Sequence, residues 1–301
     1  MSLPRIGLTV GDPAGIGPEI AIRAAADERV RSVCEPVLYG PASPDARAGF
    51  APGVVSAAAG RAAYEAIVGA ATDARAGRIS GIVTAPISKE AFALAGLPWK
   101  GHTDLLGHLC GAPRVAMMFY SPRLLVVLAT VHVALRHVPR VLTPQVLTDA
   151  IELTAESLPR FGIARPRLAV AALNPHAGEH GLMGTEDDEM LRPTIERCRA
   201  RGLEVTGPWP ADTVFVKAVR GEYDAVIACY HDQGLIPVKL LAFGTSVNVT
   251  LGLPIVRTSV DHGTAFDIAG TGRADHTSMV EAVRLAARLA ASRPPAGATH
   301  G

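Results

Sequence analysis

Short apolar runs alternating with amphipathic stretches are the feature of this sequence that most restricts its fold. Strands with this composition are buried on both faces, as in a sheet that helices cover. The runs span residues 6–10, 37–39, 81–84, 115–119, 124–131, 168–173 and 225–228. The pattern predicts an α/β fold with a mainly parallel sheet.

Three of the amphipathic stretches carry helix-start signals. Thr143 precedes a proline, so the threonine can cap a helix whose first turn holds that proline. Thr185 precedes the acidic run 186–189, whose charges favour a helix N-terminus. Ser278 and Glu281 have the spacing of a capping box. We expect helices to begin at these three points.

Charge and composition argue against two kinds of partner. The chain has 29 basic and 28 acidic residues and no basic block, so nucleic acid is not an expected partner. No apolar run approaches the roughly 20 residues that cross a bilayer, and the N-terminus lacks the pattern of a secretory signal. We expect a cytoplasmic protein whose small-residue and proline-rich tail, from Ala290, does not pack.

Three histidines share one position relative to the predicted strands. His132, His176 and His231 each follow a buried apolar run, so they should lie at the carboxyl ends of strands, where ligands bind in open α/β sheets. One histidine so placed is more often a packing residue. Three together indicate a catalytic metal site, because neutral imidazoles are favoured ligands of zinc and its neighbours. His180 lacks this placement and is assigned to the surface or a loop.

Two glycine-rich segments are further candidates for ligand binding. The loop Gly11–Glu19 (GDPAGIGPE) follows the first strand and leads into a helix, which suits either phosphate binding or a tight turn that docks the helix. Its glycine spacing is not GxGxxG, which argues against an ordinary Rossmann cofactor loop. The segment 261–270 (DHGTAFDIAG) resembles the adenosine-binding loop of isocitrate and isopropylmalate dehydrogenases. Those enzymes hold NAD without a Rossmann fold and perform metal-assisted oxidative decarboxylation.

The whole chain resembles the 4-hydroxythreonine-4-phosphate dehydrogenase family of vitamin B6 biosynthesis. The matching motifs are GDPAGIGPE at Gly11, TAPISKEA at Thr84, GHTDLL at Gly101, NPHAGE at Asn174, GPWPADT at Gly207, YHDQGLIPVK at Tyr230 and NVTLGLPIVRTSVDHGTA at Asn248. The chain departs from the family in a shortened stretch around residues 40–60. TVHVALR and DHGTAFDIAG are closer in character to relatives that act on threonate or erythronate 4-phosphate.

The resemblance implies a role for individual residues. It assigns a divalent metal (zinc, cobalt, magnesium or manganese) to His132, His176 and His231, the same three histidines that strand position selects. The implied substrate contacts are His102, Thr103, Lys239, Asn248 and Arg257, with Lys239 also catalytic. The implied NAD or NADP contacts are His262, Gly263, Thr264, Ala265 and Asp267. Taken alone, Arg257 could instead form a surface ion pair, and Lys239 could be a snorkelling edge residue.

The resemblance also implies the architecture and the reaction. It predicts two α/β/α lobes of the isocitrate and isopropylmalate dehydrogenase type, residues 1–125 with 252–301 and residues 126–251, the second contributing metal and substrate residues. It further predicts a homodimer with the active site at the interface. The expected reaction is oxidation and decarboxylation of 4-hydroxythreonine 4-phosphate to 3-amino-2-oxopropyl phosphate. The alternatives are a D-threonate or D-erythronate 4-phosphate dehydrogenase, an aromatic dihydrodiol dehydrogenase and a phosphate acyltransferase.

Overall fold

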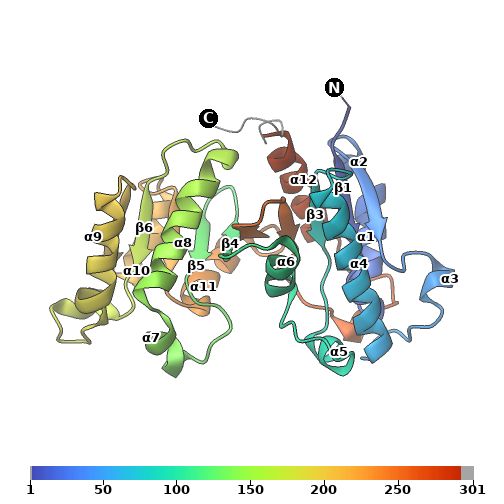
Figure 1. The fold of residues 1–301 in the computed structure, drawn as a ribbon, viewed down its shortest axis with the longest axis horizontal. Helices are drawn as coiled ribbons and strands as arrows, with labels where there is room; N and C mark the ends of the chain where they lie inside the picture. The colour runs from blue at the N-terminus through green and yellow to red at the C-terminus, as the bar shows by residue number, and fades with distance from the viewer. Residues whose placement is uncertain (1, 293–301) are drawn as a thin grey trace. The chain divides into compact units, whose positions relative to one another are not determined.

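The computed structural model describes residues 2–292, which fall into two compact units (Figure 1). Unit 1 takes in the described residues of 1–113 and 253–301, and unit 2 is Arg114–Gly252. The tail prediction lies outside the described residues from position 293 onward. No helix within residues 2–292 is both long and apolar enough to span a membrane.

Unit 1 is built on four parallel strands in the order β2-β1-β3-β10. Helix α4 packs against β1, β2 and β3, with α5 and α6 beside it, while α12 packs against β1, β3 and β10, with α1 and α2 beside it. The two helical layers bury the sheet, so Ile6, Leu8 and Ile82 are fully enclosed. The strands are β1 (Arg5–Thr9), β2 (Glu35–Tyr39), β3 (Gly81–Thr84) and β10 (Arg257–Ser259). The helices are α1 (Gly17–Ala26), α2 (Glu28–Arg31), α3 (Pro44–Arg47), α4 (Ala57–Arg75), α5 (Lys89–Leu94), α6 (His102–Cys110), η5 (Phe266–Ile268) and α12 (Thr277–Ala291).

Unit 2 contains six strands in the order β9-β4-β5-β8-β6-β7. Only β4 runs antiparallel to its neighbours β9 and β5; the other pairs are parallel. Helix α8 packs against β4, β5, β8 and β9, while α11 packs against β5 and β8, and α10 against β6 and β8. The strands are β4 (Ala116–Tyr120), β5 (Leu125–Leu128), β6 (Leu168–Ala171), β7 (Val205–Trp209), β8 (Ala225–Ala228) and β9 (Val247–Leu251). The helices are η1 (Leu135–His137), α7 (Val138–Val141), α8 (Pro144–Ser157), η2 (Leu158–Phe161), η3 (Pro175–Glu179), η4 (Asp187–Leu191), α9 (Arg192–Ala200), α10 (Ala211–Val219) and α11 (His231–Ala242).

The predicted α/β class with a mainly parallel sheet is confirmed, and every apolar run singled out in the sequence overlaps a strand. Three strands were not predicted. Strand β7 is an edge strand interrupted by Gly207 and Pro208, and β10 is a three-residue strand of polar residues, Arg257–Ser259. The third is β9, in which Asn248 and Thr250 break the apolar run. These strands lack the continuous apolar signal on which the prediction depended.

The helix-start signals have different outcomes. Thr143 caps α8 as predicted, because its side chain accepts the N–H of Val146. Thr185 directly precedes a helical segment, but its hydroxyl bonds the Glu189 carboxylate instead of the backbone. The capping box at Ser278 is wrong. Helix α12 begins at Thr277, so Ser278 lies inside its first turn, and the buried Ser278 hydroxyl accepts the N–H of Asp261.

The boundary between the units differs from the expected one at residues 125 and 126. The expectation placed β4 in the first lobe, whereas the structure groups it with unit 2. The reason is its pairing: both neighbours of β4, β5 and β9, belong to unit 2.

Candidate active site

The three histidines predicted to bind metal all follow strand ends in unit 2. His132 comes shortly after β5, His231 is the first residue of α11 after β8, and His176 lies in η3 after β6. The strands are neighbours in the order β5-β8-β6 and run parallel, so their carboxyl ends meet at one edge of the sheet. The fold therefore gathers the three segments that carry these side chains.

His132 and His231 lie close together at this edge. Their ring centroids are 5.6 Å apart. The Nδ1 atom of His231 lies 2.7 Å from an Asp232 carboxylate oxygen. A carboxylate on one ring nitrogen fixes the tautomer and leaves the other nitrogen as a metal ligand, so His231 has the environment of a ligating histidine.

His176 is presented by a left-handed turn. Every residue from His176 to Gly181 has a positive φ, between 41° and 89°. The buried Asp187 carboxylate anchors the start of this turn by accepting the N–H groups of Leu173, at 2.8 Å, and Asn174, at 3.0 Å. Left-handed backbone costs an L-residue about 1–2 kcal/mol, so such a run persists only where its surroundings fix it.

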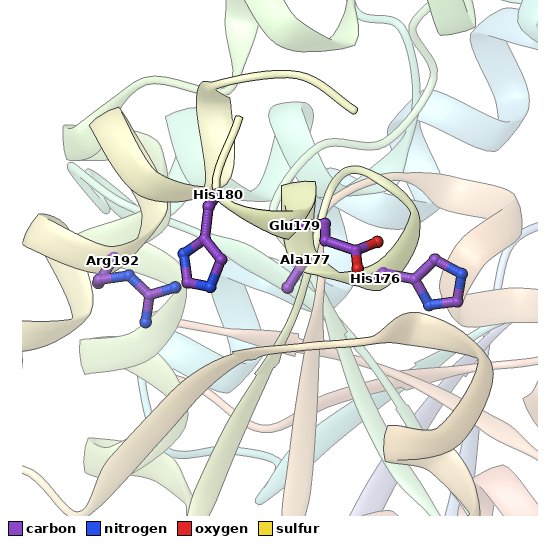
Figure 2. Close-up of a pocket in the computed structure, with 5 residues that line it drawn as sticks. All are labelled: His176, Ala177, Glu179, His180 and Arg192. Carbon is purple, nitrogen blue, oxygen red and sulfur yellow. The ribbon is translucent and has the colours of Figure 1, made fainter. Parts of the chain in front are cut away.

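A cavity of about 340 Å³ opens beside the turn. It is lined by His176, Ala177, Glu179, His180 and Arg192. Figure 2 shows His176 and Glu179 toward one end of this cavity and His180 and Arg192 toward the other. His180 is exposed in the turn, as its loop assignment expected.

The single chain brings two of the three predicted ligands together. Across residues 2–292, no three His, Cys, Asp or Glu side chains are grouped closely enough to hold a metal ion by themselves. His176 thus stands at the same sheet edge as His132 and His231 without joining them in one cluster. The donor set nevertheless suits a transition metal, because it offers neutral imidazoles at a strand edge.

Unit 1 holds a buried cation among the predicted substrate residues. Arg257 begins β10, is only 3% exposed, and donates from Nη2 to the Thr84 hydroxyl at 2.7 Å. Its burial excludes the surface ion pair and lowers the pKa of the guanidinium to about 9. Burial, together with repulsion from Arg257, holds the pKa of His102 well below its usual range, so that imidazole is neutral at pH 7. Its Nε2 atom has no hydrogen-bond partner among the described residues.

The other predicted substrate residues lie in both units and differ in exposure. Thr103 is half-buried in the first turn of α6, in unit 1. Lys239 is exposed on α11, and Asn248 is half-buried in β9, both in unit 2. The Asn248 side-chain oxygen is buried and lacks a hydrogen-bond partner among residues 2–292. A buried oxygen without a partner is suited to accept a hydrogen bond from a ligand.

The two glycine-rich segments pack against each other in unit 1. The Ile16 N–H donates to the Thr264 carbonyl at 2.9 Å, and the Glu19 carboxylate accepts the N–H groups of Gly270 and Gly272. A Cβ atom on Gly15 would lie 2.9 Å from the Thr264 carbonyl oxygen, which explains the glycine there. The first segment therefore supports the second.

This packing decides between the two interpretations of the first segment. The N–H groups of Asp12, Ala14, Gly15 and Ile16 all have partners within the protein. They are not available to cradle a phosphate, so the docking turn is the correct interpretation for these four residues. In the second segment His262, Gly263 and Asp267 are exposed, Thr264 is half-buried, and Ala265 adopts a positive φ of 42°. That exposure leaves the predicted cofactor contacts accessible.

Comparison with known proteins identifies the family. Residues 20–286 match the family described as "Pyridoxal phosphate biosynthetic protein PdxA". The chain belongs to this family. A relative named 4-hydroxythreonine-4-phosphate dehydrogenase, from Desulfosudis oleivorans, is 47% identical over 96% of both chains. A relative named D-threonate 4-phosphate dehydrogenase, from Cupriavidus necator, is 43% identical over 97% of this chain and 98% of its own.

Solved structures agree with membership of the PdxA family. The 4-hydroxythreonine-4-phosphate dehydrogenase of Klebsiella pneumoniae superposes with a TM-score of 0.86 at 40% identity, over 96% of this chain and 98% of that one. Isocitrate dehydrogenase from Methylococcus capsulatus has a TM-score of 0.51 at 17% identity, over 95% of this chain and 88% of that one. The second similarity concerns the fold alone, and it confirms the predicted architectural type.

Several buried polar residues of this PdxA-family chain were not singled out from the sequence, among them Asp187, Gln233 and Asp12. Asp187 belongs to the acidic run 186–189, which we interpreted only as helix-terminal charge, although it anchors the turn that carries His176. Gln233 lies two residues after His231, inside a helix, where an amide gives no distinctive signal. Asp12 is fully buried in the first glycine-rich segment, where it lies between Gly11 and Pro13 and gave no signal of its own in the sequence.

Asp12 leads to a prediction about pH. Burial raises the pKa of its carboxyl group above the usual 3.8, although the backbone N–H groups of Ala14 and Ser88 act in the opposite direction. A group with a raised pKa in the folded state binds its proton more tightly there than in the unfolded chain. Its contribution to the free energy of unfolding is fully present below the unfolded pKa and is lost as pH rises through the folded pKa. Asp12→Asn cannot ionise and keeps an oxygen that accepts from Ala14. The variant should therefore gain stability relative to the parent as pH rises from 4 to 7.

Urea unfolding of both proteins across this pH range measures the difference in the free energy of unfolding. If the parent instead gains stability over the variant as pH rises, the Asp12 carboxylate is stabilised in its ionised form and the effect of burial is outweighed.

Proposed function

We propose that the chain uses NAD or NADP and a divalent metal to oxidise and decarboxylate 4-hydroxythreonine 4-phosphate to 3-amino-2-oxopropyl phosphate, in pyridoxal phosphate biosynthesis. The observation that carries the proposal is the 47% identity, over 96% of both chains, with the D. oleivorans relative named for this dehydrogenase activity. The strand-end histidines and the buried cation Arg257 are consistent with such chemistry.

His132, His176 and His231 would hold the metal. When bound, a divalent metal supplies a Lewis acid that lowers the pKa of a coordinated alcohol. Imidazole ligands favour zinc or cobalt, while an oxygen-rich substrate also admits magnesium or manganese. Asp232 keeps the His231 ring in the orientation and tautomer that a ligand needs.

Arg257 and His102 would bind anionic and polar groups of the substrate, assisted by Thr103. A buried guanidinium presents a planar fork that matches a phosphate or a carboxylate, and an anionic ligand would offset the cost of burying its charge. The neutral His102 ring can accept or donate a single hydrogen bond. In unit 2, Asn248 would accept from a substrate hydroxyl or ammonium group, and Lys239 would bind an anion and relay a proton.

The segment 261–270 would hold the adenosine half of NAD or NADP. Its exposed residues His262, Gly263 and Asp267 would contact the cofactor, with Thr264 and Ala265 shaping the turn. The hydrogen bonds that this segment makes with Glu19 and Ile16 would help to hold it in place before the cofactor binds.

We also propose that the protein is a homodimer with its active site at the interface. The exposed apolar side chains Ile236, Leu240 and Phe243 support this, because they recur at helical spacing along α11 and just beyond it. Such groups on a surface are typical of a protein interface. Helix α11 also carries His231 and Lys239, so an interface here would lie beside predicted site residues.

Oxidation of D-threonate 4-phosphate is the second candidate activity. The C. necator relative named for it is 43% identical over 97% of this chain. The segments TVHVALR and DHGTAFDIAG also resemble those of enzymes that act on threonate or erythronate phosphates.

Steady-state assays with 4-hydroxythreonine 4-phosphate, D-threonate 4-phosphate and D-erythronate 4-phosphate test the choice. We expect formation of NADH or NADPH with the highest kcat/KM on 4-hydroxythreonine 4-phosphate. A higher kcat/KM on D-threonate 4-phosphate would select the second candidate. Absence of reduced cofactor with all three compounds would reject a dehydrogenase of this class.

His176 and His180 form a matched pair for testing the metal site, since both lie in the left-handed turn and line the same cavity. His176→Ala should weaken metal binding by more than about 100-fold. The reason is that loss of a residue that merely hydrogen-bonds a metal ligand already lowers metal affinity about 10- to 100-fold, and loss of the ligand itself should cost more. His180→Ala should bind metal as the parent does. Metal analysis and calorimetric titration measure both. Equal loss in the two variants would show that the turn, and not a ligand at position 176, is what matters.

Arg257→Lys keeps the charge but should lower kcat/KM on the phosphorylated substrate, because an ammonium group cannot reproduce two parallel hydrogen bonds. The loss should be about 1.5–3 kcal/mol of transition-state stabilisation, the range of a hydrogen bond to a charged group. The unphosphorylated analogue is the control, on which variant and parent should perform about equally poorly. Equal impairment on both compounds would assign Arg257 to the carboxylate or to the fold.

A further inference from the structure

A buried set of hydrogen bonds joins the ends of β5, β8 and β6. The Thr130 hydroxyl donates to the Cys229 carbonyl at 2.7 Å. The Gln233 side chain accepts the Cys229 N–H at 2.6 Å and donates to the Ala172 carbonyl at 2.7 Å. Thr130 is 6% exposed and Gln233 is 8% exposed. These four residues are referred to below as the strand-end bridge.

Each strand-end residue of the bridge precedes one of the predicted metal ligands. Thr130 lies two residues before His132, Cys229 two before His231, and Ala172 four before His176. Gln233 itself stands in the first turn of α11, which begins at His231. A displacement at any member of the bridge is therefore transmitted over a few residues of backbone to an imidazole.

The bridge begins where the sheet ladder ends. Strand β8 ends at Ala228 and β6 at Ala171, so Cys229 and Ala172 are the first residues beyond the two strands. A primary amide offers both an acceptor and a donor, and Gln233 uses one on each strand end. The amide thus links the two backbones beyond their last direct pairing, at Val170 and Ile227. Gln233 therefore joins the segments that lead to His231 and His176, beside the Cys229 thiol, which bonds the Ala171 carbonyl at 3.2 Å.

From this geometry we infer that Gln233 and Thr130 are positioning residues for the three histidines. Gln233 fixes the spacing between the His231 and His176 segments, and Thr130 ties the His132 segment to that of His231. The inference rests on the proposed function, since it requires that these histidines bind a metal ion.

The experiment compares cobalt affinity with stability in the full-length protein. Gln233→Met keeps the side-chain length but removes both hydrogen bonds, and Thr130→Val removes the hydroxyl while Thr130→Ser retains it. Thr154→Val is the matched control, because the Thr154 hydroxyl is also buried in unit 2 and donates to the Ala150 carbonyl within its own helix, α8. Titration with Co²⁺, monitored by its visible absorption at a temperature well below unfolding, gives the affinity of each protein for Co²⁺. Thermal unfolding without metal gives the stability.

We expect Gln233→Met and Thr130→Val to bind Co²⁺ about 10- to 100-fold more weakly than the parent, the range seen for residues that orient ligands. Thr130→Ser should bind within about threefold of the parent, a difference below about 1 kcal/mol. Thr154→Val should lose stability without losing affinity.

The outcomes separate the inference from the proposed function. Parental affinity in both Gln233→Met and Thr130→Val, with only stability lowered, would overturn the positioning role. The same conclusion would follow if Thr154→Val lost as much affinity as they do. If the parent binds no Co²⁺, or if His132→Ala binds it as tightly as the parent, the proposed metal site fails and the inference fails with it.

Discussion

Backbone groups beyond the last hydrogen-bonded pair of a parallel sheet must find other partners, and this constraint organises the edge of unit 2 that carries the three predicted metal ligands. A buried N–H or carbonyl without a hydrogen bond costs about 1–3 kcal/mol. Among the side chains that meet this requirement, the Gln233 amide lies between Cys229 and Ala172, and the Asp187 carboxylate accepts the N–H groups of Leu173 and Asn174. Both act on segments that carry predicted ligands, so the groups that complete the sheet also place the histidines.

The sequence predicted the fold class because strands buried on both faces have continuous apolar sequences. Runs such as Gly81–Thr84 and Ala225–Ala228 coincide with strands to the residue. Strand β10 was missed because it consists of Arg257, Thr258 and Ser259, whose burial depends on pairing with strand β3, which is distant in the chain, and on packing against helix α12. The same lack of long-range information explains the error at Ser278, where burial against Asp261 replaced the expected helix cap.

The sequence predicted that the three histidines follow strand ends, but it did not predict which side chains hydrogen-bond the segments that carry them. The location of His132, His176 and His231 followed from the polarity of parallel strands, which local sequence reveals. The family resemblance singled out Arg257, and only the structure showed that its side chain is buried. Gln233, which we infer positions the predicted ligands, donates to a carbonyl group 61 positions away in the chain, and local sequence spacing does not indicate such a contact.

The left-handed turn that carries His176 has a consequence for the order of folding. Four residues of the turn that are not glycine adopt an unfavourable left-handed backbone, and only short-range hydrogen bonds within the turn offset that cost. The turn therefore has little tendency to form alone. Its anchor, Asp187, is 13 residues from Asn174 and can act only when the helical segment that holds it has docked at the end of β6. The turn should therefore be among the last parts of unit 2 to form and among the first to open in local unfolding, and amide hydrogen exchange would reveal that order.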